Sequence, residues 1–313
     1  MGKFAAAAVG VYPAKAGIAA LCSIMLRRSE ISATRKSNRP TAPKRTGLAN
    51  FERSGVICHH MMKVLGVIPA RLESQRLPRK PLRSICGHPM IAWVYHRARQ
   101  ANCLNQLLVA TDSQEIFDYC RQSNIPAQMT SGAHRSGTDR LIEVMSRETA
   151  DICVNIQGDE PMVTAGHLDL LLAPFSQSAA TQVSTLKVAM DPEAAPSPDQ
   201  VKVVTDVNGR ALYFSRSIIP HDRDKTGAAK YYKHLGIYAY TRAALEAFRD
   251  LPQSSLEQSE KLEQLRFLEN GIPIEVVETK QDTIGVDTEE DLRKVEEFFR
   301  QAGTAPPDPG FPS

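Results

Sequence analysis

An apolar run followed by a proline-braced basic loop constrains this chain more than any other feature. Residues 64–69 (VLGVIP) are rich in Val and Ile and carry no charge, which is typical of a strand buried on both faces of a parallel sheet. Pro69, Pro78 and Pro81 cannot donate to a sheet or continue a helix, so residues 69–81 are expected to form an irregular loop. That loop leaves the carboxyl edge of the sheet, where open α/β sheets bind their ligands.

The loop places three cationic side chains, Arg71, Arg76 and Lys80, close together, and Ser74 adds a hydroxyl group. Guanidinium groups pair with phosphate oxygens, and lysine supplies a point charge. A basic surface turn is the alternative, but the buried strand and the prolines favour a loop that binds a polyphosphate. The loop contains no glycine, which excludes the glycine-rich nucleotide-binding motifs.

Beyond the loop, helical and strand-like segments alternate. Residues 107–110 and 151–156 are short apolar strands, and the segments between them have helical periodicity. This rhythm predicts an α/β fold with a Rossmann-like, doubly wound and mostly parallel sheet. Residues 201–204 and 211–214 flank an Asn-Gly turn, which predicts an antiparallel hairpin within an insertion at about residues 201–240.

A candidate metal ligand follows the strand 151–156. Gly158 permits a sharp turn, and Asp159 then projects from the same sheet edge as the basic loop. Since a carboxylate beside a phosphate site would repel the ligand, a cation is expected between them. Mg²⁺ suits such a place, because it uses few protein carboxylates and takes its other ligands from phosphate and water. A plain turn is the alternative.

Several other segments have ordinary structural interpretations. Residues 136–140 predict a capped helix start, and residues 256–270 predict one helix with an ion pair between Glu257 and Lys261. His234 is most simply a hydrogen-bonded histidine at the start of the strand 235–240. Glu263 and Gln264 are most simply solvated helix residues, and Thr288 caps a last helix that follows Asp287.

The motif at residues 69–82, Pro-Ala-Arg-x-x-Ser-x-Arg-Leu-Pro-x-Lys-Pro-Leu, resembles the N-terminal motif of the CMP-sugar synthetases. Within that family it is similar to the enzymes that activate 3-deoxy-D-manno-octulosonate (Kdo). Further family motifs follow in order: Ser-Gly-Thr-x-Arg at 136–140, Gln-Gly-Asp-Glu-Pro at 157–161, Lys-His-Leu-Gly-Ile-Tyr at 233–238 and Leu-Glu-Gln-Leu-Arg at 262–266. The resemblance covers roughly residues 63–300.

The resemblance implies a cytidylyltransferase that uses CTP and Kdo to form CMP-Kdo and pyrophosphate for lipopolysaccharide synthesis. It implies a CTP site made of Ala70, Arg71, Ser74, Arg76, Lys80, Ser136, Gly137, Thr138 and Arg140. It implies a sugar site made of Gln157, Arg216, His234, Tyr238, Glu263 and Gln264. Asp159 and Asp287 would bind Mg²⁺, and Arg71, Lys80, Asp159 and Asp287 would be the catalytic groups. The inserted antiparallel region would contribute to sugar binding and to a homodimer.

Charge and cysteine content limit the partners. Residues 1–60 hold ten Lys and Arg against two acidic residues, a charge of +8, so the net charge of +3 leaves −5 for the remainder. A nucleic-acid partner is therefore not expected. The six cysteines form no Cys-x-x-Cys pair, which is typical of reduced thiols in a cytoplasmic protein.

The two ends of the chain differ from its middle. Residues 1–61 are expected to be a disordered extension; an organellar transit peptide and translated sequence upstream of a start at residue 61 or 62 are both open. The apolar run at residues 16–26 is too short to span a bilayer, so no membrane association is expected. Residues 62–301 are expected to form a single nucleotidyltransferase domain, and residues 302–313 a flexible tail.

Three alternative functions stay open at this stage. The acceptor could be 8-amino-Kdo or another sugar acid, since no residue distinguishes a terminal hydroxyl from an amine. The enzyme could be a related nucleotidyltransferase that makes an NDP-sugar. A non-catalytic nucleotide-binding protein is the alternative from another class, and the presence of both aspartates and all three cations argues against it.

Overall fold

The computed structural model describes residues 62–74, 76–134 and 136–304. All of them lie in the second of two compact units, residues 59–313. The expected disordered extension, residues 1–61, lies outside the described residues, as do residues 305–313 of the expected tail. In the part of the chain that is described, no helix is both long enough and apolar enough to cross a membrane.

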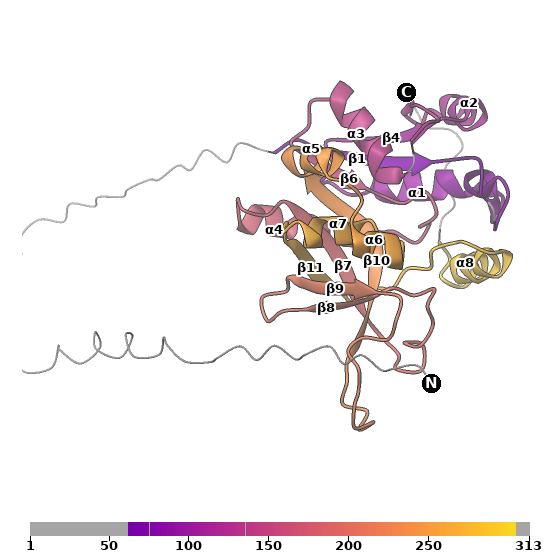
Figure 1. Ribbon diagram of the computed structural model, residues 1–313. Coiled ribbons are helices and arrows are strands. Elements are labelled where there is room, and N and C mark those ends of the chain that lie inside the picture. The colour runs from indigo at the N-terminus through magenta and orange to yellow at the C-terminus, as the bar shows by residue number, and fades with distance from the viewer. Residues whose placement is uncertain (1–61, 75, 135, 305–313) are drawn as a thin grey trace, which may run out of the picture. The chain divides into compact units, whose positions relative to one another are not determined.

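A mostly parallel sheet forms the centre of the described unit (Figure 1), in the strand order β11-β7-β10-β6-β1-β4-β5. These strands are β1 (Val64–Ala70), β4 (Gln106–Thr111), β5 (Ala127–Met129), β6 (Ile152–Asn155), β7 (Val183–Met190), β10 (Tyr231–Thr241) and β11 (Ile274–Thr279). Strands β5, β4, β1 and β6 are parallel neighbours, and β11 is parallel to β7. Only β10 on this path runs antiparallel to its neighbours. The predicted α/β fold with a mostly parallel sheet is confirmed.

Helices cover both faces of this sheet. They are α1 (Met90–Ala98), α2 (Gln114–Gln122), α3 (Gly137–Arg147), α4 (Ala165–Gln177), α5 (Arg242–Asp250), α6 (Ser255–Glu260), α7 (Gln264–Glu269) and α8 (Glu289–Gln301). Three short elements lie between β1 and α1: the 3-10 helix η1 (Lys80–Leu82) and the strands β2 (Ser84–Ile85) and β3 (His88–Pro89). As expected from the sequence, Ser136 caps α3 with a capping box, and Thr288 does the same for α8.

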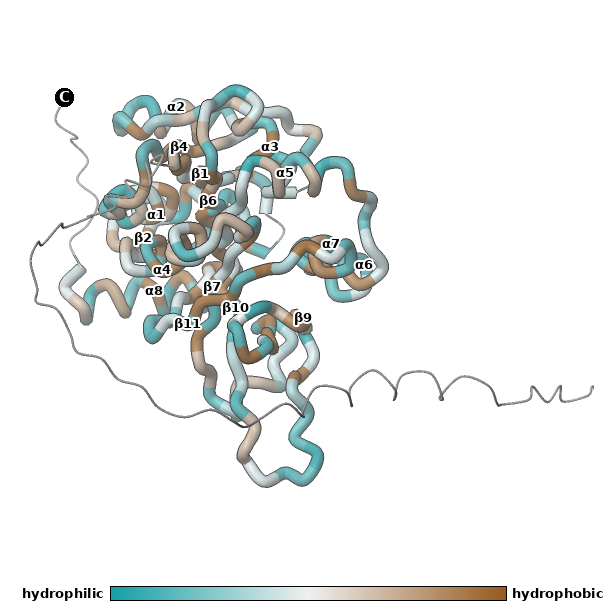
Figure 2. Tube along the Cα trace, turned by 90° about the vertical axis from the view of Figure 1, so that its left-hand side faces the viewer, coloured by the Kyte–Doolittle hydropathy of each residue, from teal (hydrophilic) through white to brown (hydrophobic). Residues whose placement is uncertain are grey.

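The side chains of β1 alternate between two hydrophobic cores. Val64 and Ile68 pack with residues of α1, α2 and α4, whereas Leu65 and Val67 pack with residues of α3, α5 and α7. A strand alternates its side chains between faces with a period of two, so a strand buried on both sides reads as a continuous apolar run. Figure 2 shows hydrophobic residues along the central strands.

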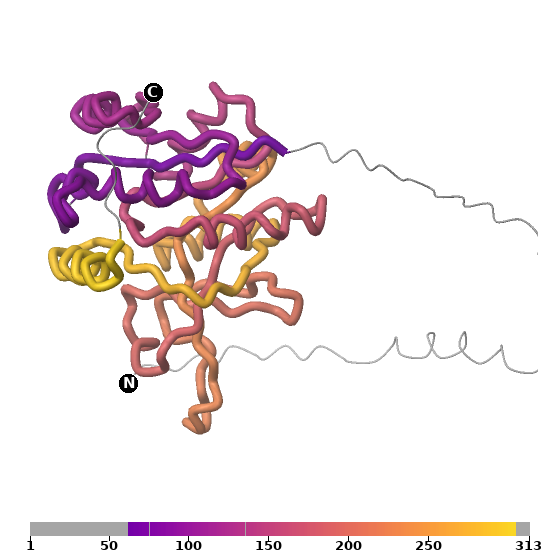
Figure 3. Tube along the Cα trace, turned by 180° about the vertical axis from the view of Figure 1, so that it is seen from behind, coloured from indigo at the N-terminus to yellow at the C-terminus, as the bar shows by residue number. Residues whose placement is uncertain are grey.

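The last helix returns to the start of the domain. α8 packs beside the segment between β1 and α1 (Figure 3), and its Phe299 stacks on Trp93 of α1 with ring centroids 4.3 Å apart. This third core also contains Leu77 and Ile85. It fixes the loop that precedes α8 close to the basic loop that follows β1.

The predicted insertion is an antiparallel hairpin of β8 (Lys202–Thr205) and β9 (Ala211–Ser215). It joins β10 through the pair Lys202 and Lys233. The turn between β8 and β9 contains Gly209 at φ +86°, a conformation that glycine adopts without a steric penalty.

The prediction of one helix over residues 256–270 is wrong. The chain turns at Lys261, whose φ is 55°, and separates α6 from α7. Arg266 on α7 makes two bonds to the carboxylate of Glu257 on α6, at 2.8 and 2.5 Å. The expected pair between Glu257 and Lys261 is therefore replaced by a pair that holds two short helices together.

The irregular loop begins at residue 71 rather than 69, because Pro69 and Ala70 belong to β1. The pairing of β1 with β6 ends at Val67, and the carbonyl of Val67 accepts from Ile156 on that side. Pro69 faces the same side two residues later, where no strand requires its missing N–H group.

Candidate functional site

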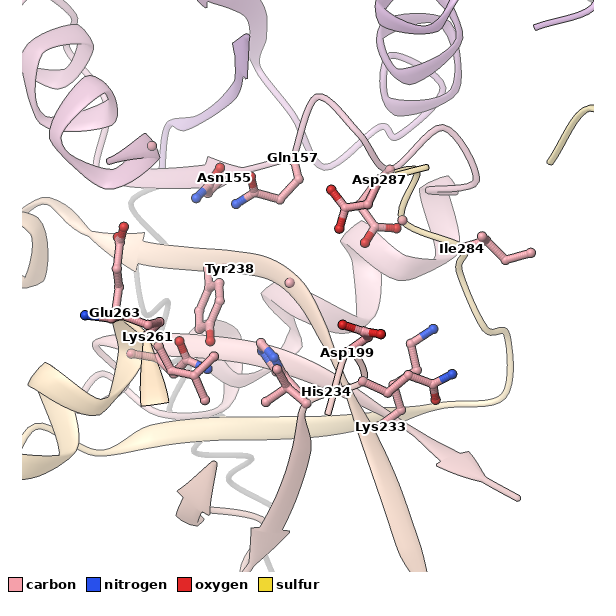
Figure 4. Close-up of a pocket in the computed structure, with 18 of the residues that line it drawn as sticks. Asn155, Gln157, Asp199, Lys233, His234, Tyr238, Lys261, Glu263, Ile284 and Asp287 are labelled. Atoms are coloured by element: carbon pink, nitrogen blue, oxygen red, sulfur yellow. The ribbon is translucent and has the colours of Figure 1, made fainter. Parts of the chain in front are cut away.

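A cavity of about 860 Å³ lies beyond the carboxyl end of β6. Its walls come from segments far apart in the sequence: the start of α3, the residues after β6, β10, the turn between α6 and α7, and the loop before α8. In the view of Figure 4, Asn155, Gln157 and Asp287 lie on one side of this space, and His234, Tyr238 and Glu263 lie on the other.

Two cations and two carboxylates form a cluster beside this cavity, and two of the four, Arg76 and Asp287, line it. The Lys80 ammonium lies 2.7 Å from Oδ2 of Asp159 and 2.9 Å from Oδ1 of Asp287. Arg76 pairs with the other oxygen of Asp287 at 2.9 Å. Burial disfavours the charged form of Lys80, but the two carboxylates outweigh it and raise the pKa of the ammonium.

The backbone brings the two aspartates together. The N–H of Val286 donates to the carbonyl of Asp159 at 2.9 Å, and the N–H of Asp287 donates to Asp291 in the first turn of α8 at 3.2 Å. A Cβ atom on Gly158 would lie 2.8 Å from the carbonyl oxygen of Pro69. The predicted turn is present, since the N–H of Glu160 donates to the carbonyl of Gln157 at 3.1 Å. Gly158 also permits the close approach of this turn to the end of β1.

The two carboxylates fit a divalent cation. Both accept from a single ammonium, so their oxygens already converge on one positive charge. Within residues 62–304, as far as they are described, there is no cluster of three or more His, Cys, Asp or Glu side chains suited to a metal. Mg²⁺ does not need one, since it is usually held by one or two carboxylates together with substrate phosphates and water.

Lys80 is described above, and the other residues expected to bind CTP divide into three groups. Arg76, Gly137 and Thr138 line the cavity. Arg71 donates to the carbonyls of His134 and Ser136, at 2.7 and 3.1 Å, and so ties the basic loop to the start of α3.

The second group lies close by but does not line this cavity. Ser74 accepts from the N–H of Leu77 at 3.4 Å and lines a separate hollow of about 500 Å³. Ala70 is buried at the end of β1. The hydroxyl group of Ser136 accepts from the N–H of Asp139, which is its capping role.

Arg140 is the third case, and it requires a correction. Its side chain has no exposed surface and pairs with Asp112 at 2.9 Å, while a second nitrogen donates to Thr130. The guanidinium therefore joins α3 to the ends of β4 and β5 and has no exposed atom to offer a nucleotide. The expected direct contact between Arg140 and CTP does not fit the structure.

Five of the six residues expected to bind the sugar acid line the cavity: Gln157, His234, Tyr238, Glu263 and Gln264. His234 shares a hydrogen bond of 3.0 Å with the hydroxyl of Thr185. That hydroxyl also lies within bonding distance of two β10 carbonyls, so the histidine donates through Nε2. Burial, aided by the nearby charge of Lys233, lowers the pKa of His234 to about 3, and the ring is neutral.

Glu263 is not the solvated helix residue that the sequence favours. It stands before the first turn of α7, lines the cavity and accepts from the hydroxyl of Thr138 at 2.7 Å. Burial raises the pKa of its carboxyl group. The contact joins a residue expected on the nucleotide side to one expected on the sugar side.

Arg216 differs from the expectation. Its Nε donates to the carbonyl of Glu260 at 2.9 Å, and Nη1 donates to the carbonyl of Pro198 at 3.2 Å. It joins the hairpin to the end of α6 and to the loop before β8, and it is not among the residues that line the cavity. Its side chain supports the cavity from behind.

Other cavity residues were not anticipated, among them Asn155, Glu160, Asp199, Lys233 and Lys261. Burial next to Asp159 raises the pKa of Glu160 to about 7. Asn155 carried a signal that was missed, because it is a polar residue at the end of an otherwise apolar buried strand. Lys233 and Asp199 carried no such sequence signal, since charged residues are common beside strands and in loops.

Comparison with known proteins identifies the family. A family model described as "Cytidylyltransferase" matches residues 65–280. The 3-deoxy-manno-octulosonate cytidylyltransferase of Acidobacterium capsulatum is 56% identical over 238 residues, which cover 76% of this chain and 97% of that protein. This chain belongs to the 3-deoxy-manno-octulosonate cytidylyltransferase family. The member from Koribacter versatilis is 54% identical over 76% of this chain and 91% of its own length.

A solved structure agrees with this membership of the 3-deoxy-manno-octulosonate cytidylyltransferase family. It is described as CMP:2-keto-3-deoxy-manno-octonic acid synthetase complexed with CTP, and its sequence is 45% identical to this one. The two folds superpose with a TM-score of 0.74 over 77% of this chain and 99% of that one.

Proposed function

We propose that this protein transfers CMP from CTP to Kdo and releases pyrophosphate, in a reaction that supplies lipopolysaccharide synthesis. One observation carries the proposal: Arg76, Lys80, Asp159 and Asp287 form one cluster of ion pairs, and Arg76 and Asp287 of this cluster line the cavity. A pair of cations suits a triphosphate, and a pair of carboxylates suits the metal ion that accompanies it.

The basic loop and the start of α3 form the proposed CTP end of the site. Arg76 is 61% exposed at its side chain, and it would exchange its contact with Asp287 for the β- and γ-phosphates. Arg71 holds the loop against the first residues of α3. The backbone N–H groups at that helix start, near Gly137 and Thr138, suit the polar groups of a nucleotide.

The opposite wall forms the proposed sugar end. On this wall neutral His234 and Tyr238 offer uncharged hydrogen-bonding groups, and Glu263 offers a carboxyl group. Gln157 offers an amide from the facing side. The anomeric hydroxyl of Kdo attacks the α-phosphorus in line. A new oxygen–phosphorus bond forms as the bond to pyrophosphate breaks, and the hydroxyl proton is lost. Holding both substrates in this alignment accounts for much of the rate enhancement that such a site can provide.

Asp159 and Asp287 would hold Mg²⁺, which when bound supplies positive charge to the phosphate oxygens. Lys80 contacts both carboxylates in the absence of substrates. To bind a phosphate oxygen, its ammonium has to give up at least one of them. The two states differ only in the position of a flexible side chain, so the exchange needs no movement of the sheet.

The test is a pyrophosphate-release assay with each of the four nucleoside triphosphates and with Kdo, 8-amino-Kdo and a sialic acid. We expect turnover only with CTP and Kdo. Preference for another nucleotide would contradict the cytidylyltransferase assignment, and preference for 8-amino-Kdo would correct the acceptor. Tight binding of CTP with no turnover under any condition would favour a non-catalytic protein.

We also propose a cytoplasmic homodimer. Val207 and Leu212 of the hairpin are exposed apolar side chains, at 101% and 62%, and the hairpin is the region expected to pair. The cysteines that the structure describes, Cys86, Cys103, Cys120 and Cys153, are all unpaired thiols, which suits a reducing compartment. Light scattering on the full chain and on a Val207→Asp, Leu212→Asp variant would test the dimer, since the variant should be a monomer.

A further inference from the structure

Lys202 is a buried lysine that pairs with no carboxylate. Its side chain has no exposed surface, yet it lies at the first position of β8, next to the wall of the cavity. Its ammonium donates to three backbone carbonyls, those of Ser197 at 2.8 Å, Gln200 at 2.7 Å and Arg216 at 2.5 Å. Three N–H groups and three acceptors match in number, so the ammonium is fully satisfied.

The three carbonyls belong to two separate segments. Ser197 and Gln200 lie in the loop between β7 and β8, and this loop supplies Asp199 to the cavity wall. Arg216 directly follows β9. One ammonium therefore holds the cavity loop and the end of the hairpin at a fixed separation.

The loop held in this way borders the sugar end of the site. The N–H of His234 donates to the carbonyl of Val201 at 2.8 Å, so the end of the loop is hydrogen-bonded to β10, the strand that carries His234 and Tyr238. Arg216 donates to the carbonyl of Pro198 in the same loop and to the carbonyl of Glu260. Glu260 lies three residues before Glu263, which lines the same side of the cavity as His234.

Charge around Lys202 is balanced by dipoles rather than by an ion pair. Burial lowers the pKa of the ammonium, Glu260 opposes this, and Arg216 adds to it. Carbonyl oxygens are the direct partners of the positive charge. Arginine would not be an equivalent replacement, because its planar guanidinium group differs in shape from a compact ammonium.

We propose that Lys202 is a positioning residue for the sugar acid: its ammonium fixes the loop 197–200 and Arg216, and through them the relative positions of His234 and Glu263 on one side of the cavity. This inference rests on the proposed function and assigns Lys202 no contact with either substrate. It also explains why Arg216 points away from the cavity, because its side chain belongs to the same support.

The experiment compares the full chain with Lys202→Met and with the matched control Lys187→Met. Lys187 is another buried lysine of the sheet, but its ammonium donates only to the hydroxyl of Thr205 at 2.9 Å. At a temperature where each variant is folded, we expect Lys202→Met to raise KM for Kdo about tenfold, since small displacements of binding groups are costly. KM for CTP should stay within about twofold, and the control should change neither value.

Hydrogen exchange supplies a readout that does not depend on turnover. In Lys202→Met the amides of residues 191–201 should exchange faster, while those of β1 and β6 should keep the wild-type rates. Lys202→Gln, which keeps two N–H donors, should fall between the wild type and Lys202→Met in both measurements, and it serves if Lys202→Met does not fold.

Three outcomes would overturn the proposal: an unchanged KM for Kdo in a folded Lys202 variant, an equal rise in KM for both substrates, or an equal effect in the Lys187 control. Each of them differs from a failure of the proposed function. That failure would appear as absent turnover of CTP and Kdo by the wild-type protein.

Discussion

The ammonium of Lys80 lies 2.7 Å from Oδ2 of Asp159, although 79 residues separate them in the chain. The same ammonium reaches Asp287 at 2.9 Å. The cation proposed to bind phosphate therefore neutralises the carboxylates proposed to bind Mg²⁺ as long as no substrate is present. The two carboxylates would otherwise repel each other at close range. The ammonium of Lys80 offsets this repulsion while no metal ion is bound.

Removal of Arg76 or Lys80, the two cations of the basic loop that are proposed to bind phosphate, should weaken CTP binding. A charge-assisted hydrogen bond contributes about 1.5–3 kcal/mol, so Arg76→Ala and Lys80→Ala should each reduce the affinity for CTP about tenfold or more. Titration calorimetry with CTP and Mg²⁺ gives the measurement. Arg79→Ala is a matched control, because Arg79 belongs to the same loop but pairs with Glu115; its affinity for CTP should be unchanged. Wild-type affinity for CTP in both the Arg76 and the Lys80 variant would exclude the proposed phosphate site.

Removal of either aspartate should abolish most turnover. Asp159→Asn and Asp287→Asn dismantle the same proposed site, so the double variant should be little worse than either single one. Without substrates, Asp159→Asn should also lower the free energy of unfolding by about 1 kcal/mol, because Lys80 loses its closer partner. The effect of Asp287→Asn on stability should be smaller, since its side chain is 42% exposed.

The measurements are turnover as a function of Mg²⁺ concentration and denaturant unfolding without ligands. Near wild-type turnover of Asp287→Asn at saturating Mg²⁺ would exclude a site built from both aspartates. A gain in stability for Asp159→Asn would show that repulsion, rather than the pair with Lys80, dominates in the absence of substrates.

The sequence predicts those parts of the fold that local signals determine. The uncharged run at 64–69 gave β1, and the Ser-x-x-Asp pattern gave the start of α3. It also predicts that Asp159 and Asp287 meet, but on the expectation that a strand end precedes each of them. Asp287 follows a loop instead, and the bond from Val286 to Asp159 brings that loop to the end of β6. The break at Lys261 could not be predicted in this way: residues 256–270 contain neither glycine nor proline, and the pair between Glu257 and Arg266 that stabilises the break forms only after folding.

Membership of a family motif does not predict whether a side chain faces the cavity or packs elsewhere. Thr138 and Arg140 belong to one motif, but two helical positions correspond to a rotation of about 200°. Thr138 consequently faces the cavity, while Arg140 faces β4 and β5. Helical geometry could have predicted that difference, whereas the direction of Arg216 depends on the contacts with Glu260 and Pro198.

Arg140→Met should therefore affect folding more than CTP binding. Loss of one partner from a buried ion pair costs about 3–5 kcal/mol, since the other charge is left without compensation. Asp112 is partly exposed, so the lower end of that range applies. At a temperature where the variant is folded, KM for CTP should stay within about threefold of the wild-type value. Denaturant unfolding and steady-state kinetics give the two quantities, and a large rise in KM with unchanged stability would restore the nucleotide contact.

Acid should destabilise the protein partly through His234. The ring packs edge-on against Phe214 and contacts Tyr238, and burial lowers its pKa to about 3, below the value of about 6.5 in an unfolded chain. The folded state thus favours the neutral ring. Its stabilising contribution is fully present above pH 6.5 and is lost as the pH falls from 6.5 toward 3.

The loss attributable to His234 should reach on the order of 2–4 kcal/mol by pH 4, since each pKa unit corresponds to about 1.4 kcal/mol. His234→Gln keeps an N–H donor for Thr185 but cannot gain a proton. We therefore expect the free energy of unfolding of this variant to fall less steeply than that of the wild type between pH 6.5 and pH 4. The measurement is denaturant unfolding of both proteins at half-unit steps of pH.

His221→Gln is the control, because His221 is exposed in the loop after β9, and its curve should follow that of the wild type. Parallel curves for wild type and His234→Gln would show that His234 is not held neutral by burial, and the assignment of an uncharged histidine to the sugar end of the site would then fail.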